Sequence, residues 1–216
     1  SLTRSGTIGL DMVTRNLNFL TGLTGVTPDG SLVIPDSMSL KMKMEMNGPQ
    51  YKAKLDLKEG KGSMNVNAAL NSSTEVYTAD LKINDLQLHH FLPKDSIYEL
   101  SLSADAKGRG LDVMSFHSLA NLNLSLDQLH YARYHLSNVH LTGNLKGALA
   151  TAQLTSDNEL LKMTADAEYN LAHSYPGGKV TVDVTQLDLY ELGLMPKPMK
   201  HPLAFNLSGE ARQNRV

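Results

Sequence analysis

The chain has 216 residues, and its 20 Lys and Arg against 22 Asp and Glu give a formal net charge of −2. Proteins that bind nucleic acid neutralise phosphates with a basic surplus or a basic cluster. This sequence has neither, so we expect no nucleic-acid partner. The absence of cysteine excludes disulfides, cysteine-ligated zinc and thiol catalysis.

The sequence shows no targeting segment and no membrane-spanning segment. It lacks a run of about 18 apolar residues, so it predicts no transmembrane helix. No signal peptide is visible, and the first residue is Ser1. Residues 209–216 follow a predicted strand, and no turn signal marks the end of that strand. We therefore expect the chain to be a segment of a longer protein.

Alternation of apolar and polar residues with a period of two dominates the sequence and predicts β-strands. The clearest case is residues 38–46, where Leu and four Met alternate with Ser, Lys and Glu. About ten or eleven strands are predicted in all. The further segments with this alternation are, in chain order, 51–57, 64–70, 77–83, 100–106, 122–126, 134–145, 148–154, 161–169, 180–184 and 203–207.

Short turns rich in Gly, Asn, Asp and Pro separate the strands and predict antiparallel pairing. These turns are Asn47-Gly48-Pro49, Glu59-Gly60-Lys61-Gly62, Asn71-Ser72-Ser73, Asp157-Asn158 and Pro176-Gly177-Gly178. Helix is expected only as short turns, some of them capped by Asp. The candidate turns are 85–91, 188–192, 15–21 and 112–119.

The sequence contains an internal repeat. Residues 80–93 match residues 183–196 at a shift of 103, and the following strand stays in phase. A weaker third copy begins at residues 10–20. We predict two β-repeat units of one continuous sheet, residues 1–110 and residues 111–216.

An antiparallel sheet with one apolar face must bury that face, and this chain predicts almost no helix to cover it. A sandwich, a closed barrel and one long sheet folded over itself all satisfy this requirement. Aromatic residues make up only 6% of the chain and Trp is absent, so Leu, Met, Val and Ala line the apolar face. Soft, small side chains suit an open groove for alkyl chains, and they equally suit a tightly closed core.

No catalytic or metal-binding motif is present. The sequence has no HExxH, no G-x-S-x-G, no P-loop and no G-x-G-x-x-G after a strand. His89 and His90 lie beside a turn, while His130, His135 and His140 are spaced by five, so on one strand they alternate faces and do not converge. We predict a non-enzymatic protein without cofactor or metal.

The sequence resembles the AsmA/TamB family of Gram-negative envelope proteins. The resemblance lies in a unit of strand, Asp-Leu turn, Pro and long alternating strand. The unit occurs as Asn84-Asp85-Leu86 to Pro93 with the strand 100–110, and as Leu187-Asp188-Leu189 to Pro196 with the strand 203–209. The resemblance implies a long, curved, mostly antiparallel sheet folded as a taco or half-pipe, with an apolar inner face. It also implies a periplasmic part of an inner-membrane-anchored protein, attached through segments outside this chain.

The resemblance further implies phospholipid transport between the membranes and outer-membrane protein assembly. Acyl chains, and outer-membrane assembly proteins, are the expected partners. A module that binds a client strand by β-augmentation is the alternative. A carbohydrate-binding sandwich ranks last, because no Trp is present to stack on a sugar. The predicted groove-lining residues are Met42, Met44, Leu55, Val66, Leu81, Ile83, Leu100, Leu102, Leu122, Leu124, Ala150, Ala152, Met163, Ala165, Val182, Val184, Leu203 and Phe205.

Overall fold

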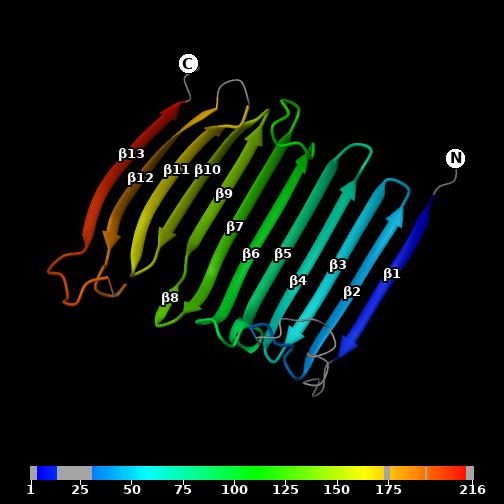
Figure 1. Cartoon of the computed structure of the whole chain (residues 1–216), viewed down its shortest axis with the longest axis horizontal. Helices are drawn as coiled ribbons and strands as arrows, with labels where there is room; N and C mark the ends of the chain where they lie inside the picture. The colour runs from blue at the N-terminus through cyan, green and yellow to red at the C-terminus, as the bar shows by residue number, and fades with distance from the viewer. Residues whose placement is uncertain (1–3, 14–30, 173–175, 193, 213–216) are drawn as a thin grey trace. The chain divides into compact units, whose positions relative to one another are not determined.

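A computed structural model describes residues 4–13, 31–172, 176–192 and 194–212. Nearly all regular structure in these residues is β-strand (Figure 1). One 3-10 turn, η1 (Leu88–His90), interrupts the strands. The strands are β1 (Ser5–Val13), β2 (Met38–Asn47), β3 (Gln50–Glu59), β4 (Gly62–Asn71), β5 (Val76–Gln87), β6 (Ile97–Arg109), β7 (Leu119–Tyr131), β8 (Tyr134–Leu136), β9 (Val139–Lys146), β10 (Leu149–Asp157), β11 (Leu161–Asn170), β12 (Gly177–Leu187) and β13 (Leu203–Arg212).

The strands form one open 13-stranded sheet in the order β1-β2-β3-β4-β5-β6-β7-β9-β10-β11-β12-β13, with β8 paired to β7. The neighbours whose register is resolved are antiparallel, as the short turns predict. The predicted all-β, antiparallel fold with short helical turns only is therefore confirmed. Two details differ: β1 was not among the predicted strands, and residues 134–145 form two strands separated at Asn138, which has a positive φ of 53°.

The described strands group into two compact units. Unit 1 comprises Ser1–Ser73, Thr78–Ala104 and Asp127–His135, and unit 2 comprises Thr74–Tyr77, Asp105–Leu126 and Leu136–Val216. The division passes through β5, β6, β7 and β8, so each unit is built from segments that are distant in sequence. The prediction of two repeat units divided at residue 110 stays a prediction.

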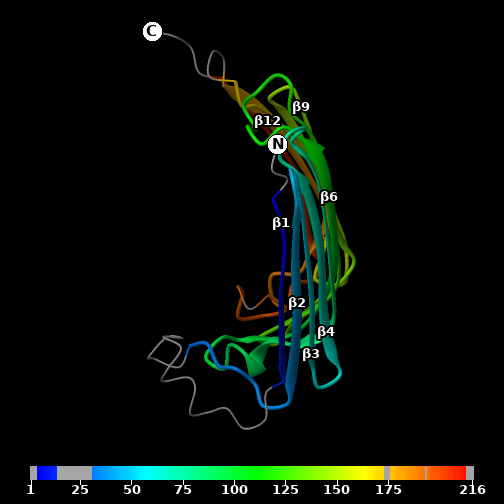
Figure 2. The same ribbon diagram turned by 90° about the vertical axis from the view of Figure 1, so that its right-hand side faces the viewer.

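The core of unit 1 lies on the apolar face of the sheet, at one end of its strands. Met38, Leu57, Ile83 and Leu86 form the buried cluster. Side chains from outside the strands cover it: Ile34 precedes β2, and Leu88 and Phe91 follow β5. The backbone N–H of Val33 donates to the carbonyl of Phe91 over 2.7 Å and joins the two covering segments. Figure 2 shows both segments on the same side of β2, β3 and β4.

The predicted turn at residues 85–91 is confirmed as η1, but Asp85 does not cap it. Asp85 has a positive φ of 47°, a conformation that Asp tolerates better than most residues. The hydroxyl of Ser101 accepts from the Asp85 N–H over 2.8 Å and donates to its carboxylate over 3.1 Å. This irregularity shifts the alternation of β5, so that Ile83 and Leu86 both face the core.

Unit 2 contains the two other described candidate turns, and an Asp caps each. The carboxylate of Asp188 accepts from the N–H groups of Tyr190 and Glu191, both over 3.0 Å. Asp112 accepts from the N–H of Met114 over 3.0 Å. Neither segment forms a regular helix. The fourth candidate, residues 15–21, lies outside the described residues.

Candidate functional site

The apolar residues of unit 1 fall in register on one face of the sheet. Every second residue of β1 to β4 is apolar, and the pairing aligns these residues in rows across the strands. Three such rows are Ile8–Met44–Ala53–Ala68, Leu10–Met42–Leu55–Val66 and Met12–Leu40–Leu57–Met64. The opposite face is polar: Asp11, Lys41, Asp56 and Asn65 form one of its rows.

Unit 2 repeats this arrangement over β7 and β9 to β13. Its apolar rows include Leu124–Leu141–Leu154–Ala165–Val182–Leu207, Leu126–Val139–Ser156–Met163–Val184–Phe205 and Leu122–Gly143–Ala152–Ala167–Val180–Gly209. Gly, Ala and Ser stand among the larger apolar side chains of these rows, and they are most frequent in the third row.

The structure distributes the predicted lining residues over these two apolar faces. Met42, Met44, Leu55 and Val66 lie in the rows of unit 1, and Leu81, Leu100 and Leu102 pack beside its core. The residues from Leu122 to Phe205 lie on unit 2, where Ala150 pairs with Tyr169, and Leu203 with Leu187. Ile83 and Val184 are a correction: both side chains are buried and add no open surface, and Ile83 belongs to the covered core of unit 1.

Much of the apolar surface remains open to solvent. Met44 of unit 1 is 47% exposed and Leu207 of unit 2 is 60% exposed. The same alternation indicates further members that were absent from the predicted lining set. They include Ile8, Leu10, Met12, Leu141, Leu154, Val180 and Leu207.

The apolar face of unit 1 ends at a buried carboxylate. Glu59 follows Leu57 on the same face and pairs with Met38, and its side chain is only 6% exposed. Its Oε1 lies 2.7 Å from Nδ1 of His90. Its Oε2 is buried and has no hydrogen-bond partner among the described residues. A charged group thus closes one end of an otherwise apolar face.

A hollow of about 420 Å³ lies on the apolar face of unit 2, near the end of β11 and the start of β12. A Cβ on Gly178 would meet the carbonyl of Glu168 at 2.5 Å and the ring of Tyr169 at 2.6 Å, so the position requires glycine. The lining residues on this face are Ala167, Tyr169, Gly178, Val180, Gly209 and Ala211.

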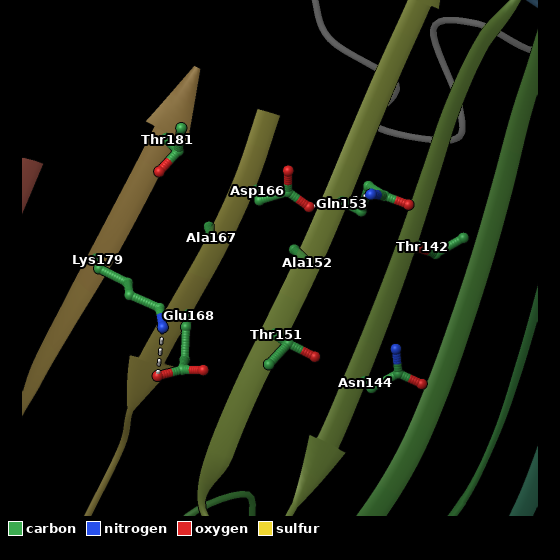
Figure 3. A pocket seen from close by; sticks show the side chains of 10 residues that line it. All are labelled: Thr142, Asn144, Thr151, Ala152, Gln153, Asp166, Ala167, Glu168, Lys179 and Thr181. Carbon is green, nitrogen blue, oxygen red and sulfur yellow. Dashed lines mark hydrogen bonds and ion pairs between the residues drawn. The ribbon is translucent and has the colours of Figure 1, made fainter. Parts of the chain in front are cut away.

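A second hollow, of about 360 Å³, has mainly polar walls on β9 to β12 (Figure 3). Lys179 and Glu168 form an ion pair at 3.6 Å, and the Gln153 amide donates to Asp166 over 3.0 Å. Both carboxylates therefore have neighbouring partners. The lining contains no histidine or cysteine, and it offers no nucleophile paired with a base.

The histidine prediction is wrong in one respect. A turn at Ala132 separates β7 from β8, so His130 and His135 lie on paired strands and their rings stack at 4.1 Å. Tyr98 of β6 extends this row, with its ring centroid 4.8 Å from that of His130. In the part of the chain that the structure describes, no group of three or more His, Asp or Glu side chains has the geometry to hold a metal ion.

No protein-family model, curated protein or solved structure matches this chain. No helix within the described ranges is long and apolar enough to cross a membrane. The candidate site consists of two ordered apolar surfaces, one on each unit, with small hollows on unit 2.

Proposed function

We propose that the chain is a non-enzymatic, periplasmic segment of an inner-membrane-anchored envelope protein. In this proposal its apolar faces hold the acyl chains of phospholipids during transport between the inner and outer membranes, and so serve envelope assembly. The observation that supports it is the register. In each unit, apolar side chains occupy every second position across neighbouring strands, and several stay about half exposed.

The energetics favour an alkyl ligand that needs no charged anchor. Burial is worth about 0.8 kcal/mol per methylene, so a chain of roughly sixteen carbons gains about 12 kcal/mol before ordering costs. Methionines on β2 adapt to an irregular ligand, because their unbranched side chains have many rotamers. The mechanism is passive: tails lie on the face, head groups remain in water, and lipids slide because no residue binds one position tightly.

Native mass spectrometry of the purified chain, combined with organic extraction of the same sample, tests the proposal. We expect phospholipid or fatty acid at a reproducible stoichiometry. Protein that stays empty after incubation with phospholipid vesicles would argue for a closed core and against the proposal.

Two adjacent residues of β12 provide a matched test. Val180 lies on the apolar face and Thr181 on the polar face, and both are exposed. Val180→Arg places a charge where tails would lie, so it should lower fatty-acid binding on the order of tenfold or more. Thr181→Arg should bind like the wild type. Leu102→Arg is a poorer variant, because Leu102 packs against the core of unit 1 and the charge would disturb folding.

The alternative function is strand addition at a sheet edge. β1 and β13 are the terminal strands of the sheet order and span 9 and 10 residues without proline. Long, flat edges accept extended partners through backbone hydrogen bonds. This alternative predicts that a client peptide, such as a strand of an outer-membrane protein, binds equally to the wild type and to Val180→Arg.

A further inference from the structure

The loop between β6 and β7 concentrates exposed apolar side chains. Leu111, Val113, Met114 and Phe116 are 58%, 50%, 42% and 75% exposed, within a loop of unit 2 that spans residues 110–118. Figure 1 shows this green loop beyond the arrowhead of β6. Isolated exposed apolar residues are ordinary, but four in one short loop mark an interaction surface.

Hydrogen bonds hold the loop in a defined conformation. The N–H of Gly110 donates to the carbonyl of Glu75 over 3.1 Å, and that of Ser115 donates to the carbonyl of Asp112 over 3.0 Å. Gly147, in the turn between β9 and β10, donates to the carbonyl of Ser118 over 2.9 Å, and Ser118 is fully buried. These polar backbone groups are satisfied within the protein, while the apolar side chains point to solvent.

The loop lies at the same end of unit 2 as the apolar hollow. Leu119, which follows the loop, starts a cross-strand row that continues through Lys146, Leu149, Asn170 and Gly177. The hollow lies one residue inward from this row, at the neighbours of Asn170 and Gly177. The exposed loop and the apolar hollow therefore lie at one and the same strand end of unit 2.

Tyrosines border the apolar face at this end. The ring of Tyr169 lies over Gly178, and the hydroxyl end of the Tyr77 side chain lies over Gly108, so neither glycine has room for a Cβ. Tyr169 is 47% exposed, and a half-exposed tyrosine whose ring packs against the protein is typical of membrane interfaces.

The charges around the loop favour an anionic surface. Lys107 and Arg109 lie just before it, and Lys146 pairs with the residue just after it; all three are exposed. The carboxylates of Glu75 and Asp112 also lie at the loop, where each accepts a hydrogen bond from a loop N–H group, over 3.3 Å and 3.0 Å respectively. Lys and Arg close to a membrane attract anionic head groups. They would gain no such attraction from a partner protein with an uncharged apolar surface.

We propose that the loop of residues 110–118 inserts its apolar side chains into the interface of a bilayer with anionic head groups. Lipid tails would then reach the apolar face of unit 2 past the tyrosines at its rim. The inference rests on the proposed function, because it names the surface from which the acyl chains come.

The absence of Trp from the chain gives a clean probe of this proposal. Phe116→Trp places a single tryptophan at the most exposed apolar residue of the loop, and its indole can be excited selectively over the tyrosines. Leu194→Trp is the matched control, because Leu194 is 71% exposed in the loop between β12 and β13, at the opposite strand end. With vesicles of phosphatidylethanolamine and phosphatidylglycerol, the indole emission of Phe116→Trp should shift to the blue and be quenched by brominated lipid. The emission of Leu194→Trp should not change.

Flotation with the same vesicles measures docking without a fluorophore. The double variant Met114→Ser, Phe116→Ser should bind vesicles on the order of tenfold or more weakly than the wild type. Binding by the wild type should weaken in high salt and on phosphatidylcholine vesicles. Circular dichroism establishes that each variant is folded.

A monomeric fluorescent fatty acid separates this proposal from the proposed function. Fatty-acid binding by Phe116→Trp, without a change in its indole emission on vesicles, would overturn docking and leave the proposed function intact. Vesicle docking without fatty-acid binding would overturn the proposed function and leave the docking proposal intact. A concentration-dependent blue shift of the same indole without vesicles would make a second copy of the chain the partner, and would overturn the lipid assignment.

Discussion

Removal of the His90 side chain should destabilise unit 1, because His90 is the hydrogen-bond partner of a buried carboxylate. Nδ1 of His90 lies 2.7 Å from Oε1 of Glu59, and the Glu59 side chain is 6% exposed. The second oxygen, Oε2, already lacks a hydrogen-bond partner among the described residues. In His90→Ala both oxygens would face the apolar core without a donor.

The expected size of the effect follows from this burial. Breaking a fully buried ion pair costs about 3–5 kcal/mol, and losing a hydrogen bond to a charged group costs about 1.5–3 kcal/mol. His90 itself is 44% exposed, so water can replace part of the lost interaction. We therefore expect a loss of about 2 kcal/mol in the free energy of unfolding.

A double-mutant cycle in urea identifies the cause. Glu59→Met removes the carboxylate with little change in volume, so adding it to His90→Ala should restore the stability of the wild type or exceed it. Lys41→Ala is the control, because the Lys41–Asp11 ion pair is exposed and should contribute less than about 0.5 kcal/mol. The reasoning is refuted if His90→Ala unfolds like the wild type, or if the double variant is as unstable as the single variant.

Two further predictions test the packing and register of the sheet. Gly178→Ala should destabilise the chain by about 1–3 kcal/mol, because its Cβ would meet the Tyr169 ring at 2.6 Å, whereas Gly209→Ala, with its nearest contact at 3.8 Å, should unfold nearly like the wild type in urea. The Asn65 amide donates to Asp56 over 2.7 Å and holds the pKa of that carboxyl below its usual range, so Asn65→Leu should raise the pKa of Asp56 in an NMR titration. Because a lowered carboxyl pKa stabilises the fold at neutral pH, the stability difference between Asn65→Leu and the wild type should shrink as the pH falls through the Asp56 titration; an unchanged pKa would contradict the pairing of β3 with β4.

The alternation of apolar and polar residues predicted most of the sheet. A strand with one buried face requires an apolar residue at every second position, so this feature is written directly in the sequence. β2 lies within one residue of its predicted segment and β3 within two, since their alternation holds over nearly their whole length. β1 was missed, although Ile8, Leu10 and Met12 alternate correctly. Gly6 and Gly9 interrupt its apolar and polar patterns and lower its strand propensity.

Features that depend on contacts distant in sequence were not predictable. The irregularity at Asp85 depends on the Ser101 hydroxyl, which lies 16 residues away in the chain. The stacking of His130 on His135 depends on a turn at Ala132, which no Gly or Pro announces. For the exposed loop at residues 110–118, the sequence predicts only a short helical turn over residues 112–119. The exposure of its apolar residues depends on the loop conformation, which is fixed by hydrogen bonds to Glu75 and Gly147 elsewhere in the chain.

The exposed apolar faces also distinguish the two candidate functions. A strand added beside β13 would pair its backbone with that edge, but it would extend the sheet and, with matching alternation, would bring its own apolar side chains onto the same face. The area of exposed apolar surface would then grow, and Leu207 would gain a neighbour without gaining a cover. An acyl chain lying across the rows removes that surface from water at about 25 cal/mol per Å². Strand addition alone therefore leaves the apolar face in contact with water, whereas the proposed acyl ligand would remove it from water. For this reason the Val180→Arg variant tests the proposed function more directly than any change at an edge.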